Sequence, residues 1–261
     1  MVDAQASLLV VRVGGELYGM YLTDVREMVA TPASTPVPGT PGCVRGLINL
    51  RGTIIPLLDL RLRMGMPSLA QEVASLTGLL RQREGDHIRW VEDLRGSVRE
   101  NRLFTGTLDP HGCGFGRWYD VFHTDDLILS LQLRRFGEPH ERIHEVGAQV
   151  VDLVRGDCLA EARDIVERRA VRELARLSAL FAEVRATLQE RHDEVSVILE
   201  GKRRFALAVD AVIGVENVVR VEPYEGQEPG ISGIGTSSRD GSFILVTSVD
   251  GLLSIPAASC G

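Results

Sequence analysis

The stretch "VRVGGELYGMYLTDVREMV" at residues 11–29 decides the fold class, because a related stretch, "VILEGKRRFALAVDAVIGV", returns at residues 197–215. The two copies align at glycine, aromatic and valine positions: Gly14 with Gly201, Tyr18 with Phe205 and Val25 with Val212. Each copy predicts a strand, a turn and a second strand, since short apolar runs flank the glycine. Each also predicts a short helix that opens near Asp24 or Asp210, where a carboxylate can cap free N–H groups.

The rest of the chain divides into strand-like ends and a helical middle. Residues 7–67 are rich in proline, glycine and β-branched runs, and strand patterns return from residue 193 onward. From residue 68 to 191 proline is scarce and apolar residues recur at spacings of three and four, which is typical of amphipathic helices. A duplicated unit split in this way predicts one β-rich domain that is interrupted by an inserted helical domain.

The composition excludes several classes of partner. The 261 residues are 44% hydrophobic, enough for a sizeable core, and the net charge is −7 without any block of lysine or arginine. No apolar run approaches the roughly 18 residues that a membrane span needs, and the first residues lack the pattern of a signal peptide. The four cysteines lie far apart, which favours reduced thiols. We therefore expect a cytoplasmic protein with no nucleic-acid partner and no membrane insertion.

The helical segment predicts an antiparallel bundle of about four helices in which histidines share the core-facing stripes. The stripes consist of Leu76, Leu80, His87, Trp90, Val91, Leu94 and Val98, then Phe136, His140, Ile143, His144, Gly147, Val151 and Val154, and finally Leu174, Leu177, Phe181, Val184 and Leu188. A lone histidine on such a face is usually a hydrogen-bonded core residue. Three in one small bundle are costly to bury without partners, so they point to a shared ligand.

That ligand is predicted to be a zinc ion. His140 and His144 are one helical turn apart, so both rings can reach one ion. Cys113 lies in the glycine-rich stretch "HGCGFGRWYD", which places its sulfur near the start of a short helix, where the helix dipole and a nearby cation favour the thiolate. Three imidazoles and one thiolate form a complete tetrahedral set. The predicted ligands are His87, Cys113, His140 and His144.

The segment "HERIHEVGAQV", which starts at His140, also contains the H-E-x-x-H pattern of zinc peptidases. A peptidase needs a third ligand, an open coordination position and a glutamate beside the bound water. Val150 stands where a third histidine would stand, and Glu141 lies about 100° round the helix from His140, toward the outside. A zinc metallopeptidase is therefore kept as the less favoured alternative. His111 and His123 are expected to be exposed.

The segment "GLINLRGTIIPLLDLRLRM" at residues 46–64 resembles the signature of CheW-like domains, adaptors that couple bacterial chemoreceptors to the histidine kinase CheA. The stretches at residues 18–29, 205–215 and 241–253 are similar to the same family. The resemblance implies two small intertwined β-barrels without catalytic residues. It also implies a loop that contacts receptor and kinase, which falls here on Asn49, Leu50, Arg51 and Gly52, and the expected partner-binding residues are Asn49, Arg51 and Gly52.

The helical segment resembles the chemoreceptor zinc-binding (CZB) domain through "HIRW" at His87, "CGFGRWY" at Cys113 and "HERIH" at His140. In that family the corresponding three histidines and the cysteine bind one zinc ion, which gives the same four ligands. The family is associated with zinc sensing and with oxidant sensing, in which the zinc-bound cysteine reacts with hypochlorous acid, so the resemblance implies a redox-reactive Cys113. Gly114 departs from the family, in which a larger and often basic residue is common.

The sequence thus predicts an α+β multidomain protein: a CheW-like double β-barrel (residues 8–67 and 192–258) interrupted by an inserted four-helix zinc-binding bundle (residues 68–191). The expected function is a non-enzymatic chemotaxis adaptor that joins the CheA regulatory domain to the cytoplasmic tip of a chemoreceptor within receptor arrays. Loss of zinc or oxidation of Cys113 would regulate it. Two alternatives stay open: the bundle is a purely structural zinc module, or it is a dimerisation module that forms a homodimer.

Overall fold

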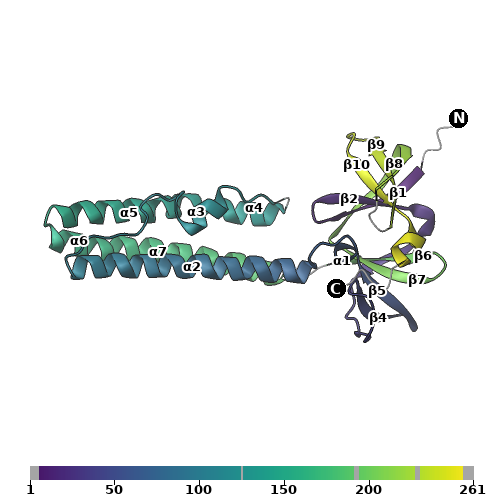
Figure 1. Cartoon of the computed structure of the whole chain (residues 1–261), viewed down its shortest axis with the longest axis horizontal. Helices are drawn as coiled ribbons and strands as arrows, with labels where there is room; N and C mark the ends of the chain where they lie inside the picture. The colour runs from purple at the N-terminus through teal and green to yellow at the C-terminus, as the bar shows by residue number, and fades with distance from the viewer. Residues whose placement is uncertain (1–5, 125, 191–193, 227–229, 255–261) are drawn as a thin grey trace. The chain divides into compact units, whose positions relative to one another are not determined.

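A computed structural model describes residues 6–124, 126–190, 194–226 and 230–254 (Figure 1). The chain divides into two compact units. We call residues 1–72 and 192–261 the β unit and residues 73–191 the helical unit. Both ends of the chain contribute to the β unit. The predicted borders at residues 192 and 258 lie outside the described residues.

The β unit consists of two five-stranded sheets. The first closes into a barrel, in the order β1 (Ala6–Val13), β2 (Glu16–Tyr21), β10 (Phe243–Thr247), β9 (Ile231–Ser237) and β8 (Ala211–Pro223). The second has the order β3 (Val25–Ala30), β6 (Val195–Glu200), β7 (Arg204–Val209), β5 (Thr53–Asp59) and β4 (Val44–Leu50). It is not closed in the part of the chain that the structure describes, so the expected pair of closed barrels is wrong for this half.

The internal repeat explains how the two sheets interlock. Strands β1 and β2 of the first copy pair antiparallel in the barrel, and β6 and β7 of the second copy pair antiparallel in the other sheet. The last strand of each copy crosses over, because β3 pairs with β6 while β8 pairs with β1. Each copy therefore supplies a strand to the sheet of the other copy, and residues 1–72 and 192–261 form one compact unit.

The short helices predicted at Asp24 and Asp210 are wrong. A single 3-10 turn, Leu22–Asp24, precedes β3, and β8 begins directly after Asp210. The Asp210 carboxylate is used elsewhere: it accepts the backbone N–H of Gly14 at 2.8 Å and forms two hydrogen bonds of 2.7 Å with Arg61. A carboxylate held by these partners cannot cap a helix start.

Ion pairs hold the two segments of the β unit that lie just before and just after the helical insertion. Arg45 on β4 donates to Asp59 and to Glu194, which precedes β6. Asp59 also caps the short helix α1 (Leu60–Arg63). Arg61 on α1 contacts Asp210 and Glu72. The residues before and after the insertion are thereby held by side chains of the β unit itself. Helix α8 (Val249–Leu253) closes this unit, with Leu252 buried in its core.

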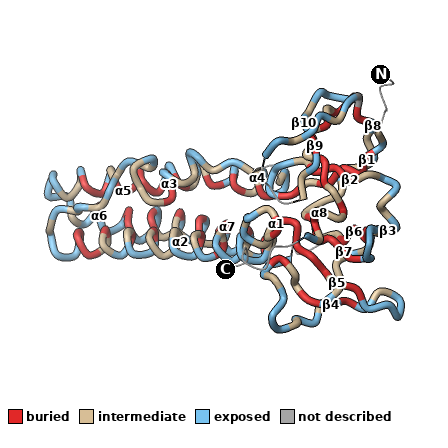
Figure 2. Tube along the Cα trace, turned by 45° about the vertical axis from the view of Figure 1, so that its right-hand side comes forward, coloured by how far each residue is buried: buried red, intermediate tan, exposed pale blue. Residues whose placement is uncertain are grey.

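The helical unit contains long helices packed along one another, with their buried faces turned inward (Figures 1 and 2). The elements are α2 (Leu69–Arg99), α3 (Gly114–Tyr119), α4 (Leu127–Arg134), α5 (Gly137–Arg155), α6 (Leu159–Ile165), a π-helical turn (Val166–Ala170) and α7 (Val171–Glu190). Because α6, the π turn and α7 follow without a break, the unit has three long helices with α3 and α4 as short additions. No helix in the described ranges is both long and apolar enough to cross a membrane.

Candidate metal centre

Three elements of the helical unit bring the four predicted ligands together. Helix α2 carries His87, helix α5 carries His140 and His144, and Cys113 directly precedes α3. The donor atoms of all four lie within 4.8 Å of one another. Cys113 Sγ is 3.2 Å from His140 Nε2, and the His140 and His144 ring centroids are 5.0 Å apart. The spacing within the sequence therefore predicted a spatial cluster that the structure contains.

The cluster is enclosed by aromatic side chains. The three histidines are between 1% and 4% exposed. The Phe115 ring centroid lies 4.8 Å from that of His140, and Phe115 in turn packs against Phe136 and Phe181. Phe115, Phe136 and Phe181 are among the most completely buried side chains of the chain. The imidazoles thus sit in a largely apolar environment.

This environment keeps the imidazoles neutral. Burial, reinforced by repulsion from His87, lowers the pKa of His140 to about 3 and the pKa of His144 to about 4. Burial also lowers the pKa of His87. A neutral imidazole offers a lone pair to a metal ion, whereas a protonated one does not. All three rings are therefore in the ligating form at neutral pH.

The hydrogen bonds of the rings leave nitrogen atoms free inside the cluster. His87 Nδ1–H donates to the Arg83 carbonyl at 2.7 Å, so that the Nε2 lone pair points away from helix α2. Among the described residues, His87 Nε2 and both ring nitrogens of His144 are buried without a hydrogen-bond partner. An unpaired buried polar group costs about 1–3 kcal/mol. Three such atoms in one cluster indicate a site that is completed by a ligand.

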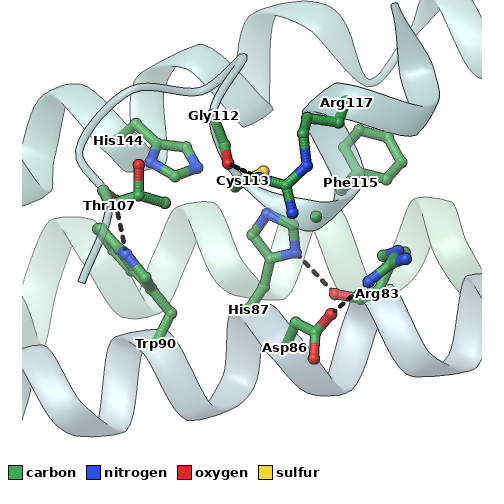
Figure 3. A pocket seen from close by; sticks show the side chains of 11 residues that line it. Arg83, Asp86, His87, Trp90, Thr107, Gly112, Cys113, Phe115, Arg117 and His144 are labelled. Carbon is green, nitrogen blue, oxygen red and sulfur yellow. Dashed lines mark hydrogen bonds and ion pairs between the residues drawn. The ribbon is translucent and has the colours of Figure 1, made fainter. Parts of the chain in front are cut away.

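A wall formed by Trp90 and a loop holds His144 in place (Figure 3). The Trp90 indole N–H donates to the Thr107 carbonyl at 2.9 Å, and the Trp90 ring centroid lies 5.1 Å from that of His144. Burial lowers the pKa of His144, and the Thr107 carbonyl opposes this effect in part. Trp90 packs on Gly147 of α5, where a Cβ atom would come within 2.3 Å of the indole. Sequence patterns did not predict the roles of Arg83 and Thr107, because these act through backbone carbonyls.

Cys113 caps α3, as the glycine-rich sequence predicted. Its Sγ accepts the backbone N–H of Gly116 at 3.2 Å. The predicted contributions of the helix start and of nearby cations to a thiolate are present, but burial has the larger effect. Burial raises the pKa of Cys113 and outweighs the opposing effects of the Gly116 and Phe115 N–H groups, Arg117 and Arg83. A bound cation is the remaining means of holding this sulfur as a thiolate.

The four residues fit a zinc ion. One thiolate and three neutral imidazoles match the preference of zinc for sulfur and nitrogen ligands. Bonds of about 2.0–2.3 Å in a tetrahedron give donor separations of roughly 3.3–3.8 Å, so a cluster that fits within 4.8 Å needs only a small contraction. His87 and His144 each offer one buried ring nitrogen to the cluster of donor atoms that would surround the ion.

The features required of a peptidase are not assembled at this cluster. Glu141 is exposed and Val150 is fully buried among apolar side chains. Four protein ligands would complete a tetrahedral shell and leave no position for a catalytic water. His111 and His123 are exposed, and His111 Nδ1 lies 2.9 Å from an Asp120 oxygen.

The predicted partner-binding residues form the hairpin between β4 and β5. Arg51 has φ +50° and Gly52 φ +90°, which makes a tight turn, and the Asn49 side chain accepts the Gly52 N–H at 2.7 Å. The Arg51 side chain is 79% exposed and pairs with Glu27 at 2.7 Å. The turn therefore presents a basic side chain to solvent.

Two families of known domains match this chain. Residues 7–88 match the CheW-like domain, and residues 87–151, which include all four cluster residues, match the chemoreceptor zinc-binding domain. The two matched segments adjoin and together run from residue 7 to residue 151. The chain carries a CheW-like domain followed by a chemoreceptor zinc-binding domain.

Individual relatives share the first of these domains. Similar proteins include the chemotaxis protein CheW of Treponema pallidum, with 39% identity over 61 residues, and that of Rhizobium meliloti, with 39% over 59 residues. These alignments cover 23% of this chain and 36% and 38% of the relatives, so the chain matches little more than a third of their length. The crystal structure of the scaffolding protein TtCheW from Thermoanaerobacter tengcongensis aligns with 97% of this chain and 95% of its own, at 16% identity and a TM-score of 0.45.

Proposed function

We propose that this protein is a non-enzymatic chemotaxis adaptor whose helical unit regulates it through a zinc site. The observation that carries the proposal is the cluster of His87, Cys113, His140 and His144, with three buried nitrogens lacking partners, in a chain that also matches the CheW-like domain. The β unit would join the CheA regulatory domain to the cytoplasmic tip of a chemoreceptor in a receptor array. This role places the protein in the cytoplasm.

The second part of the β unit completes the CheW-like domain in this proposal. Neither family match extends beyond residue 151. The support comes from the strand exchange, because β3 pairs with β6 and β8 pairs with β1. The matched strands β1 to β5 thus depend on strands after the insertion for their hydrogen-bond partners. Residues 8–67 and 192–258 would then be one domain interrupted by residues 68–191.

At the zinc site each residue has a separate task. His87 is oriented by the Arg83 carbonyl, and His140 and His144 approach from α5 as neutral rings. Cys113 supplies the one anionic ligand, and zinc when bound would stabilise its thiolate. Because helices α2 and α5 and the segment before α3 share this one centre, removal of zinc or of the Cys113 ligand would release them from one another.

Two events would act on the centre in the proposed regulation. The first is loss of zinc. The second is oxidation of Cys113 by hypochlorous acid to sulfenic acid, in which the sulfur is oxidised and the chlorine is reduced to chloride. Either event weakens the coupling of α2 to α5, and the change is passed to the β unit where the chain enters and leaves the insertion. The exposed Arg51 turn, with Asn49 and Gly52, is the proposed contact with kinase and receptor.

The alternative of a structural or dimerisation module has one observation in its favour. Helix α4 exposes an apolar face, with Leu127 70%, Ile128 49% and Leu131 52% exposed. A second copy of the chain could cover this face and form a homodimer. Sedimentation of the full chain with and without chelator tests the dimer. A purely structural or dimerisation module would in addition leave the affinity for CheA unchanged when zinc is removed.

Metal analysis of the purified full chain tests the zinc site. We expect about one zinc ion per chain, loss of most of it in Cys113→Ala and His144→Ala, and full retention in His111→Gln, whose ring is exposed and serves as the matched control. Stoichiometric zinc that survives Cys113→Ala, together with a peptidase activity that Glu141→Gln abolishes, would establish the metallopeptidase instead.

Binding assays test the adaptor role. The affinity for a CheA regulatory domain and for a receptor tip is measured with zinc, with chelator, and after mild treatment with hypochlorous acid. We expect binding in the zinc form and a changed affinity in the other two. Failure to bind either partner removes the adaptor role and leaves the zinc site standing. Unchanged affinity in all three conditions removes the regulation.

A further inference from the structure

A pocket of about 320 Å³ opens beside the metal cluster and is lined by its reactive sulfur (Figure 3). Cys113, His87 and His144 form part of its wall. Two arginines, Arg83 from α2 and Arg117 from α3, line the same pocket. The pocket thus brings a nucleophilic sulfur and two permanently charged guanidinium groups together.

The positive charge of the pocket is only partly neutralised. Arg117 donates to the Gly112 carbonyl at 2.5 Å and has no carboxylate within ion-pair distance among the described residues. Arg83 pairs with one oxygen of Asp86 at 3.0 Å, but Arg89 takes the other oxygen at 2.6 Å. One carboxylate is thus shared by two arginines. The Arg83 Nε atom is in addition buried without a hydrogen-bond partner.

The position of Arg83 depends on a glycine. A Cβ atom on Gly114 would lie 2.6 Å from Arg83 Nη1 and 3.2 Å from Cζ, so the missing side chain provides the space in which the guanidinium lies beside Cys113. Asp86 of α2 lines the pocket beside Arg83, whereas Asp109 accepts the backbone N–H of His111 and does not line it.

We propose that this pocket binds a small anion, of the size of a carboxylate or a simple oxyanion, next to the Cys113 sulfur. Arg83 and Arg117 are its binding residues, because a guanidinium presents several donors in a plane and suits carboxylate or oxyanion geometry. The consequence is charge selection, since anionic reagents reach this sulfur more readily than neutral reagents of the same shape. The inference rests on the proposed function in one respect, that Cys113 is the reactive group of the centre.

Alkylation by iodoacetate and by iodoacetamide tests the charge selection, because the two reagents differ by one negative charge and little in shape. In each reaction a sulfur–carbon bond forms, the carbon–iodine bond breaks, and iodide leaves with the bonding electrons. The full chain is treated with chelator and the rates at Cys113 and Cys158 are followed by peptide mass spectrometry. Cys158 is exposed, directly precedes α6 and does not line the pocket, so it is an internal reference.

The measured quantity is the ratio of the iodoacetate rate to the iodoacetamide rate. We expect this ratio at Cys113 to fall about 3- to 10-fold in Arg83→Gln and in Arg117→Gln, as expected for removing one nearby charge at a partly buried site. The ratio at Cys158 should stay the same. Arg99→Gln, which removes an exposed charge four turns further along α2, is the matched control and should change neither ratio.

A ratio at Cys113 that is the same in the wild type and in both variants would overturn the proposal. If both rates fell equally and the ratio therefore stayed the same, the arginines would act on the thiolate and bind no anion. Zinc content is measured separately on the same proteins. A wild type without zinc would end the proposed function, whereas the rate ratio would still report on the pocket.

Discussion

The two units bury polar groups in opposite ways. In the β unit Asp59 is 1% exposed, yet it is bonded to Arg45 and caps α1, and Arg61 is bonded to Asp210 and Glu72. Among its described side chains the one buried polar atom without a partner is Arg63 Nε. In the helical unit the orphaned atoms include three imidazole nitrogens in one cluster. The paired charges stabilise the fold by themselves, while the unpaired nitrogens require a ligand.

This difference predicts that the two units respond to different changes. Metal and acid should act on the helical unit, and removal of a charged partner should act on the β unit. Both tryptophans of the chain, Trp90 and Trp118, belong to the helical unit, so their fluorescence reports on that unit alone. Hydrogen exchange of β1 and β6 reports on the other unit.

Removal of zinc should have the largest effect. A ligand present at a thousand times its dissociation constant stabilises the folded state by about 4 kcal/mol. We therefore expect chelation to lower the unfolding free energy of the helical unit by about that amount, measured by tryptophan fluorescence in denaturant, and to have a much smaller effect on exchange in β1 and β6. In Cys113→Ala the chelator should have a much smaller effect. An equal unfolding free energy of the helical unit with and without zinc would contradict the prediction that its unpaired nitrogens require a ligand.

The substitution Arg45→Leu should have the next largest effect, confined to the β unit. It leaves the Asp59 and Glu194 carboxylates, which are 1% and 13% exposed, without their cation. Loss of one partner from a buried ion pair costs about 3 kcal/mol. Hydrogen exchange should show this loss, with zinc content unchanged. Arg26→Leu is the control, because its pair with Glu200 is exposed and should contribute less than about 1 kcal/mol.

Acid should destabilise the zinc-free helical unit. The folded pKa values of His140, about 3, and His144, about 4, lie below the ordinary value of 6.5. The unfolded chain therefore binds more protons below pH 6.5, so stability present above that pH is lost as the pH falls toward 4. Each imidazole contributes about 1.4 kcal/mol per pH unit in this window. Tryptophan-monitored unfolding between pH 7 and 4 measures the slope.

A variant with one imidazole removed sharpens the pH prediction. His140→Asn should lower the slope by about 1.4 kcal/mol per pH unit, because one strongly shifted imidazole is gone. His123→Gln is the control and should keep the slope of the wild type, since His123 is exposed. A slope that is the same in all three proteins would mean that groups other than these imidazoles control the acid response.

The sequence predicted the ligand cluster better than it predicted the sheets. Histidines at i and i+4 on a stripe of regular helical period must lie together, so His140 and His144 could be placed from spacing alone. The error at Asp210 has a different cause. Whether a carboxylate caps a helix or binds Arg61 depends on a residue 149 positions away, which no local pattern contains. Closure of one sheet and not the other likewise depends on strand pairing across the insertion.

Glycine substitutions should give effects of opposite sign within the helical unit. Alanine at an exposed helical position such as Gly78, which has no atom within 4 Å of its Cβ position, should stabilise by up to about 1 kcal/mol. Gly147→Ala instead places its Cβ 2.3 Å from Trp90. We expect a loss of about 1–2 kcal/mol and weaker zinc binding, because Trp90 packs on His144. Thermal unfolding and zinc titration measure both, and a stabilised Gly147→Ala would show that the indole wall does not position His144.

The substitution Arg51→Ala should have the smallest effect on stability and the clearest effect on partners. The side chain is 79% exposed, so its ion pair with Glu27 should contribute less than about 0.5 kcal/mol. In the proposed adaptor the same side chain contacts kinase or receptor, and its loss should weaken that binding about tenfold, or about 1.4 kcal/mol. Arg220→Ala is matched to it, since Arg220 is 74% exposed and also pairs with a glutamate. If Arg51→Ala and Arg220→Ala bound kinase and receptor with equal affinity, the β4–β5 turn would not belong to the interface. Arg51 would then be a solvated arginine like Arg220.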